Sequence, residues 1–266
     1  MDLIQSLILG AIQGLTEFLP ISSTAHLVLL PWFLSWNDNG LPFNVALHVG
    51  SLIAIIFYFW RDWMLIGRDF LKSVAERSFE GRPSGKIGMF LLIATVPGAL
   101  SGFLFEEQAA GLFRNPLSIA FTLSAFGLLL YISDRFSRRD KSVEDMDLTD
   151  CIIIGLAQAL AIVPGVSRSG VTITGAMFRN FKRDEAARFS FLLAAPLIAG
   201  AGIFESRHLA YSDVVSAPFI AGFIASAVFA FLAIKYLLRF VRKSSYTLFV
   251  IYRLILAVLI VFMYLK

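Results

Sequence analysis

The sequence predicts an all-α polytopic membrane protein, built as an inverted-topology repeat of six transmembrane helices and two re-entrant helical hairpins. Hydrophobic residues make up 58% of the 266 residues and charged residues only 16%, whereas soluble domains average about half and about a quarter. Six apolar runs are long enough to cross a bilayer, and two further apolar runs are interrupted midway. These observations exclude a soluble single domain and place the function within the membrane or at its surface.

The expected elements follow one another in two similar series. The first series is an interrupted apolar stretch at about 3–34 followed by crossings at 44–60, 87–105 and 116–133. The second is an interrupted stretch at about 151–178 followed by crossings at 188–204, 217–238 and 246–265. Pro, Gly, Ser, Thr and a few ionisable residues break the two interrupted stretches. Irregular backbone at membrane depth is tolerated only where protein or a cavity surrounds it, so we expect re-entrant hairpins there.

The two interrupted stretches also resemble each other in sequence. Gly10, Gln13, Leu15 and Pro20 of the first align with their counterparts in the second, which are Gly155, Gln158, Leu160 and Pro164. Each stretch precedes three crossings, and a half with an odd number of crossings must be inverted relative to its partner. We therefore expect one membrane domain, residues 1–266, made of a repeat at about 1–135 and an inverted repeat at about 150–266.

Basic residues predict the orientation. If residues 61–86 are cytoplasmic, eighteen Lys and Arg residues lie on that side and only Arg114, Arg207 and Lys266 on the other. This positive-inside bias puts both termini outside. We read the net charge of +4 as an orientation signal and expect no nucleic-acid partner. The single cysteine, Cys151, excludes an intramolecular disulfide and a cysteine-cage metal site.

Two ionisable residues stand out because they lie within the interrupted stretches. Glu17 is in the middle of the first and Arg168 is in the second. A charged group at membrane depth is costly and is by default a functional hypothesis. The alternative is that Glu17 and Arg168 pair only to neutralise each other between the hairpins.

Hydroxyl residues cluster where each interrupted stretch is expected to restart as a helix. The free N–H groups of a helix N-terminus, with hydroxyls and a guanidinium nearby, form an anion site suited to phosphate. Two such ends converging would hold a diphosphate. The alternative is N-capping, which explains one hydroxyl per helix but not the cluster. The clustered hydroxyls are Ser22, Ser23 and Thr24 after Pro20, and Ser167, Ser169, Thr172 and Thr174 after Pro164.

Two histidines and a second arginine at membrane depth complete the candidates. His26 follows Ser22 by four residues and Ser23 by three, so the three can share a helix face. It is either a catalytic histidine or a buried one that a hydroxyl satisfies. His48 begins a crossing and is a weaker candidate for the cavity wall. Arg253, in the last crossing, either snorkels toward the cytoplasmic end or pairs inside the bundle with a partner that the sequence does not identify.

The residues described above belong to two longer motifs, Gly14-Leu15-Thr16-Glu17-Phe18-Leu19-Pro20-Ile21-Ser22-Ser23-Thr24-Ala25-His26 and Pro164-Gly165-Val166-Ser167-Arg168-Ser169-Gly170-Val171-Thr172. These closely resemble the two signature motifs of the undecaprenyl-diphosphate phosphatase family, also called the bacitracin-resistance proteins. The resemblance extends over nearly the whole chain. It implies a membrane phosphatase that removes the terminal phosphate of a C55 isoprenoid diphosphate, recycles the lipid carrier for cell-wall synthesis and uses a divalent cation.

The resemblance also implies roles for individual residues. Many family members have Glu where this chain has Gln13, and Gly where it has Ala25; losing a carboxylate weakens a two-carboxylate metal scheme, although a Gln oxygen can still bind a hard cation. We expect Glu17 and Gln13 to hold Mg²⁺ or Ca²⁺. The residues with implied functional roles are Gln13, Glu17, Ser23, His26, Ser167, Arg168 and Thr172.

The sequence therefore predicts an enzyme that hydrolyses undecaprenyl (polyprenyl) diphosphate in the plasma membrane, with an active site open to the outer face. The expected catalytic residues are Ser23, His26, Glu17 and Arg168. We favour Ser23 as nucleophile with His26 as its base over direct attack by His26. A secondary transporter or lipid flippase and a membrane scaffold are the alternatives, and a homodimer is possible. The residues expected to bind the substrate phosphates are Ser22, Thr24, Ser167, Arg168, Ser169, Gly170 and Thr172.

Overall fold

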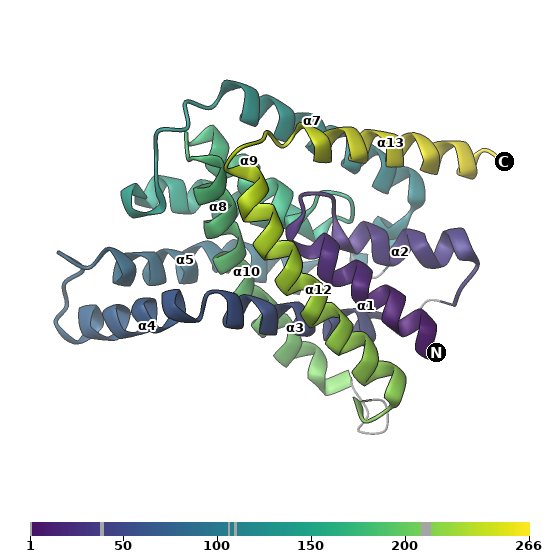
Figure 1. Ribbon diagram of the computed structural model, residues 1–266, viewed down its shortest axis with the longest axis horizontal. Helices are drawn as coiled ribbons and strands as arrows, with labels where there is room; N and C mark the ends of the chain where they lie inside the picture. The colour runs from purple at the N-terminus through teal and green to yellow at the C-terminus, as the bar shows by residue number, and fades with distance from the viewer. Residues whose placement is uncertain (1, 38–39, 106, 109–110, 209–213) are drawn as a thin grey trace.

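The computed structural model describes residues 2–37, 40–105, 107–108, 111–208 and 214–266, and this part of the chain is helical, without β-strands (Figure 1). The fold class is therefore all-α, as predicted. The helices are α1 (Leu3–Phe18), α2 (Ser23–Leu34), α3 (Gly40–Tyr58), α4 (Trp60–Ala75), α5 (Pro83–Leu104), α7 (Pro116–Phe136), α8 (Leu148–Ala159), α9 (Arg168–Phe178), α10 (Arg183–Glu205), α12 (Ala217–Val241) and α13 (Thr247–Tyr264). Short 3₁₀ turns lie at Leu112–Arg114, Val143–Asp145, Leu160–Ile162 and Ser206–His208.

Five helices are each long and apolar enough to cross a membrane, namely α5, α7, α10, α12 and α13. A sixth span is obtained when α3 and α4, which are bent by 79° at their junction, are taken together. This confirms a polytopic membrane protein. The structure differs from expectation at 61–86, which we read as a cytoplasmic loop but which contains α4. That helix has a polar, basic face and an apolar face, the pattern of a helix lying along an apolar surface.

The two interrupted stretches form helical hairpins, α1 with α2 and α8 with α9. Each hairpin turns at its proline, and the residue before the second helix is a serine with positive φ: 73° at Ser22 and 70° at Ser167. Non-glycine residues rarely adopt this backbone. Each serine side chain accepts the N–H of the residue three positions later, Ala25 at 3.4 Å and Gly170 at 3.1 Å. The capping bond thus compensates for an unfavourable backbone conformation.

Small residues allow each hairpin to pack closely on a helix of the other half. α1 lies against α12 and α8 lies against α5 (Figure 1). At Gly10 an added Cβ would lie 2.1 Å from the carbonyl oxygen of Gly222. At Gly155 it would lie 3.0 Å from the Cα of Ala94. Further contacts across the molecule join α3 to α10 and α7 to α13. Helices of the first half thus pack directly against helices of the second half, and the two halves do not form separate layers.

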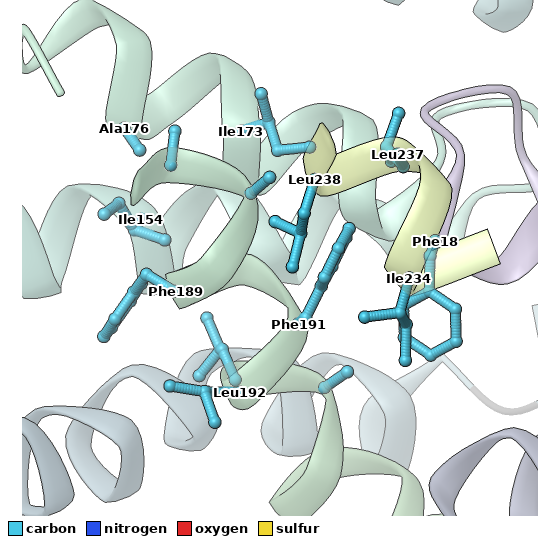
Figure 2. Close-up of a cluster of buried hydrophobic side chains, with 14 of the residues drawn as sticks. Phe18, Ile154, Ile173, Ala176, Phe189, Phe191, Leu192, Ile234, Leu237 and Leu238 are labelled. Carbon is cyan, nitrogen blue, oxygen red and sulfur yellow. The ribbon is translucent and has the colours of Figure 1, made fainter. Parts of the chain in front are cut away.

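The main hydrophobic core surrounds α10 (Figure 2). Phe189, Phe191 and Leu192 of α10 lie at its centre and are fully buried. Figure 2 shows Phe191 on the side of Leu238 and Ile234 of α12 and Phe18 of α1, and Phe189 on the side of Ile154 of α8. The Phe18 and Phe191 rings meet edge to face with centroids 5.0 Å apart. Because Phe18 directly follows Glu17, this packing fixes the end of α1 that carries the buried carboxylate.

Ion pairs join α7, α8 and α10 to the segments next to them. The two chain termini lie together on one side of the molecule, at the right of Figure 1. Arg183 Nε lies 2.6 Å from Asp134 Oδ1, and the backbone N–H of Tyr246 donates to the same carboxylate at 3.0 Å. Asp150, at the start of α8, pairs with Lys141 and Arg179. These contacts tie the linker between the halves to the base of the second hairpin.

Candidate active site

The buried carboxylate of Glu17 and the guanidinium of Arg168 lie in direct contact. Arg168 Nη2 donates to Glu17 Oε1 at 2.7 Å, and Arg168 Nη1 donates to the carbonyl oxygen of Ser190 at 2.8 Å. The two side chains are 5% and 11% exposed. The sequence placed both residues at membrane depth but could not show that they touch. Burial makes the pair costly to break, because either partner alone would leave an uncompensated charge.

Ser23 is the first residue of α2, and its hydroxyl points at the same carboxylate. Ser23 Oγ donates to Glu17 Oε2 at 2.7 Å. The Gln13 amide, one helical turn before Glu17, donates to the same oxygen at 2.8 Å. Glu17 therefore holds a hydroxyl on one oxygen and a guanidinium on the other.

His48 of α3 also reaches this carboxylate. Its Nε2 lies 3.4 Å from Glu17 Oε2. Its Nδ1 donates to the carbonyl oxygen of Asn44 at 2.7 Å, which fixes the ring orientation. His48 was the weaker candidate of the two histidines, yet it is His48 that contacts Glu17.

The two hairpin turns touch each other. The backbone N–H of Gly165 donates to Ser22 Oγ at 3.1 Å, and Ser169 Oγ donates to the carbonyl oxygen of Leu19 at 3.1 Å. The N-termini of α2 and α9 are thus brought together. The N–H groups of a first helical turn have no acceptor within their own helix, so two sets of free donors converge at this point.

His26 does not contact Ser23 in this structure. Its Nδ1 donates to the carbonyl oxygen of Ser22 at 2.7 Å, and its Nε2 is hydrogen-bonded to the hydroxyl of Tyr252 at 2.7 Å. The His26 and Tyr252 rings are also stacked, with centroids 5.7 Å apart. Both ring nitrogens are therefore engaged away from Glu17. The expected arrangement, in which His26 takes the Ser23 proton and Glu17 orients the ring, is corrected: Glu17 itself accepts the Ser23 hydrogen bond.

A cavity of about 310 Å³ opens at the Glu17–Arg168 pair. Of the residues expected to bind phosphate, three line it: Thr24, Ser167 and Arg168. The expected catalytic residues Glu17 and Ser23 line it as well. Its wall also includes His48, Arg114 and Gln158 and is otherwise mostly apolar. An adjoining, mostly apolar cavity of about 380 Å³, whose wall also includes Thr95 and Glu205, shares Val45, Gly98, Leu197 and Ala201 with it and lies between α5 and α10.

The other expected phosphate ligands do not line this cavity. Ser22 caps α2 and holds Gly165, and Gly170 donates its N–H to Ser167 Oγ. Ser169 bonds to Leu19. Thr172 Oγ1 donates to the Arg168 carbonyl oxygen at 2.8 Å and lies 2.7 Å from Ser190 Oγ. These side chains lie on the faces of α2 and α9 that pack against protein, so their contacts hold the turns in place.

The amide oxygen of Gln13 has a property that could not be predicted from the sequence. Its Oε1 is buried and has no hydrogen-bond partner, and the same is true of Oε1 of Gln158, its counterpart in the second hairpin. Within the described residues, no group of three or more His, Cys, Asp and Glu side chains could hold a metal ion. The possible metal ligands at this place are the Glu17 carboxylate, the Ser23 hydroxyl, the His48 Nε2 and the free amide oxygen of Gln13. This set fits a hard cation that receives its other oxygens from a phosphate and water, as Mg²⁺ commonly does.

Two contact residues were not predicted. The carbonyl oxygen of Ser190 in α10 accepts a hydrogen bond from Arg168, and the Ser190 hydroxyl is hydrogen-bonded to the Thr172 hydroxyl. Tyr252 of α13 holds His26. Both lie in ordinary apolar crossings, where a single Ser or Tyr gives no distinguishing pattern. Gln158 was recognisable only by its alignment with Gln13.

Comparisons with known proteins agree with the motifs. The family model described as bacitracin resistance protein BacA matches residues 6–259. An undecaprenyl-diphosphatase of Moorella thermoacetica is 49% identical over 261 residues, which cover 98% of this chain and 97% of that protein. Proteins of the same name from Pelotomaculum thermopropionicum and Geotalea daltonii are 46% and 45% identical, each match covering 96% of this chain and 94% and 95% of those proteins.

Proposed function

The chain belongs to the bacitracin resistance protein BacA family, and from this premise we propose that it is an undecaprenyl-diphosphatase. It hydrolyses undecaprenyl diphosphate to the monophosphate and inorganic phosphate, recycles the lipid carrier for cell-wall synthesis and confers bacitracin resistance. The observation that carries the proposal is the buried contact of Ser23, Glu17 and Arg168 at two converging helix N-termini.

The site meets the main requirements of phosphoryl transfer, which are positioning and charge neutralisation. The free N–H groups of α2 and α9, together with the Arg168 guanidinium, bind the phosphate oxygens. The N–H groups at a helix N-terminus favour anions because they point outward and lie at the positive end of the helix dipole. Arg168 can leave Glu17 in part and share its planar fork with two phosphate oxygens.

Ser23 is the nucleophile in this proposal. Its Oγ attacks the terminal phosphorus, the bond from that phosphorus to the bridging oxygen breaks, and the lipid monophosphate leaves with the electron pair. Glu17 Oε2, at 2.7 Å, accepts the Ser23 proton. Water then attacks the phosphoserine, inorganic phosphate leaves, and the proton returns to Ser23 Oγ. His26 serves as a positioning residue of the α2 turn, since its ring ties Ser22 to Tyr252.

A divalent cation, Mg²⁺ or Ca²⁺, would bind with the diphosphate. Glu17 would supply a carboxylate oxygen and Gln13 its unpartnered Oε1. When bound, the ion neutralises the negative charge of the two phosphates.

The adjoining cavity suits the lipid part of the substrate. It is lined by apolar residues such as Phe103, Pro196 and Phe204, and it continues from the site into the region between α5 and α10. An isoprenoid chain entering there keeps its diphosphate at Arg168 and its hydrocarbon in an apolar environment. The positive-inside bias of the loops, eighteen basic residues against three, favours opening of the active site toward the outer face of the plasma membrane.

A transporter or flippase was the alternative function from another class, because inverted repeats with broken helices are typical of transporters. The relatives reported above carry a hydrolase name. A membrane scaffold would leave Glu17 and Arg168 without a role.

Phosphate release tests the proposal. Purified protein in detergent or liposomes is given undecaprenyl diphosphate with Mg²⁺, with Ca²⁺, or with chelator. We expect release of inorganic phosphate with a divalent ion and little with chelator. The absence of release with any divalent ion would contradict the hydrolase assignment and favour transport. Release that chelator leaves unchanged would remove the cation from the proposal.

A further inference from the structure

Arg253 of α13 is completely buried and belongs to neither candidate hairpin. Its guanidinium donates to five carbonyl oxygens. Nε donates to Leu123 at 2.9 Å, and Nη1 donates to Pro20 at 3.3 Å. Nη2 donates to Gly165 at 2.7 Å, Val166 at 3.1 Å and Thr122 at 3.4 Å. Of the two alternatives that the sequence left open, the structure rejects snorkelling: Arg253 pairs within the bundle, with backbone carbonyls rather than a carboxylate.

These carbonyls come from three separate segments. Pro20 lies in the turn of the first hairpin, Gly165 and Val166 lie in the turn of the second, and Leu123 lies in α7. One planar side chain therefore connects both turns to a transmembrane helix. Each connected turn immediately precedes a serine with positive φ, Ser22 or Ser167, at which the next helix begins.

The peptide geometry links this contact to the site. In a trans peptide unit the C=O and the N–H point in opposite directions. Arg253 holds the carbonyl of Val166, so the N–H of the following residue, Ser167, faces away from Arg253. Ser167 lines the cavity beside Arg168. By holding the Val166 carbonyl, Arg253 therefore also fixes the direction of the Ser167 N–H on the other side of the turn.

Two glycines leave room for the Arg253 side chain. A Cβ added at Gly127 would lie 3.4 Å from Arg253 Nε, and one added at Gly170 would lie 3.0 Å from Nη1. The preceding residue, Tyr252, holds His26 at 2.7 Å. Thr122 reinforces the same turn from α7 through a 2.7 Å bond from its hydroxyl to the Pro164 carbonyl oxygen.

We propose that Arg253 is a positioning residue for phosphate binding: by holding the carbonyls of both hairpin turns, it sets the N-termini of α2 and α9 at the separation and orientation that a diphosphate requires. It does not touch the substrate. This inference deepens the proposed function and rests on it for the identity of the ligand. Its fixed positive charge behind both turns adds to the attraction for the anion.

Arg253→Lys separates positioning from charge. A lysine keeps the charge, but its single ammonium cannot span both turns as a planar fork does. Inorganic pyrophosphate is the probe, because it carries the diphosphate chemistry without the lipid. We expect Arg253→Lys to weaken pyrophosphate binding at least tenfold by isothermal titration calorimetry. It should also lower kcat/KM for lipid diphosphate at least thirtyfold per folded molecule.

Arg183→Lys is the matched control. Arg183 is a partly buried arginine, 20% exposed, that pairs with Asp134 near the base of the second hairpin, away from the cavity lining. We expect it to lower the midpoint of thermal unfolding while leaving pyrophosphate affinity and kcat/KM within threefold of wild type. Thr122→Val, which removes the bond to Pro164, should weaken pyrophosphate binding three- to tenfold, and it carries the test if Arg253→Lys does not fold.

The outcomes are distinguishable. Unchanged pyrophosphate affinity in folded Arg253→Lys would overturn the inference and reduce Arg253 to a structural residue. Unchanged affinity in Thr122→Val would do the same where the lysine variant does not fold. If wild-type protein binds pyrophosphate but releases no phosphate from the lipid, the proposed function fails while the role of Arg253 in anion binding is still measured.

Discussion

The Arg168 guanidinium lies 2.7 Å from the Glu17 carboxylate and so joins two hairpins across 151 positions of sequence. The pair is part of the wall of the cavity, where a diphosphate can compete for the guanidinium. In the proposed function, the same contact contributes to stability in the free protein and to substrate binding.

Arg168→Lys should lose at least about 100-fold in kcat/KM, equivalent to about 3 kcal/mol of transition-state stabilisation. Arg168 bonds to Glu17 and to the Ser190 carbonyl at once through two nitrogens, and a lysine point charge cannot reproduce this geometry. The measurement is phosphate release per folded molecule. Turnover close to wild type would reduce Arg168 to a generic countercharge.

Glu17→Gln should destabilise the protein by about 3 kcal/mol, because it leaves Arg168 buried without its carboxylate. Reversible unfolding in mixed detergent measures this free energy. The double variant Glu17→Gln/Arg168→Gln should recover part of the loss, because it removes both charges. Equal stability of Glu17→Gln and wild type would contradict the view that the pair ties the hairpins together.

Ser23→Ala should abolish a phosphoenzyme that wild type forms. Reactions with labelled substrate, quenched during turnover, should give an acid-stable, alkali-labile adduct in wild type and none in Ser23→Ala, since the Ser23 hydroxyl contacts Glu17 at 2.7 Å. Ser22→Ala is the control. It should lose about 1 kcal/mol of stability as a helix cap yet keep the adduct. An acid-labile adduct that survives Ser23→Ala and disappears in His26→Ala would assign the nucleophile to His26.

Cysteine labelling should establish the orientation. In a Cys151→Ser background, Ser78→Cys between α4 and α5 should resist an impermeant thiol reagent added outside intact cells. Val215→Cys just before α12 should react with it. Both positions are exposed in the structure, whereas Ser212 in the same predicted outer loop lies outside the described residues. The reverse labelling pattern would invert the topology and contradict the positive-inside reading.

The helices were predictable because each crossing is a continuous apolar run whose bounds agree with the structure to within a few residues. Residues 217–238, for example, correspond to α12, Ala217–Val241. The bend between α3 and α4 was not predictable, since the apolar run ends there and no proline or glycine marks the change of direction.

The candidate site was predictable in its residue types but not in its pairings. Glu17 and Arg168 stood out because membrane depth makes a charge expensive. The partner of Ser23 was misassigned because helical spacing places His26 near Ser23, whereas the ring turns toward Tyr252, 226 positions away. The partners of Arg253 are backbone carbonyls, which carry no residue identity and therefore leave no trace in a sequence.

Ser22 and Ser167 have nearly the same backbone, with φ and ψ of 73° and 92° in one and 70° and 111° in the other. The next residue, at the first position of the restarted helix, differs: it is Ser23 in one and Arg168 in the other. A dimer of identical subunits with this geometry would carry two serines or two arginines at these equivalent places. The two equivalent positions can be substituted independently only when both hairpins are encoded in one chain. Fusion into one polypeptide thus allows a hydroxyl and a guanidinium to specialise on matching scaffolds, so that a symmetric backbone supports asymmetric chemistry.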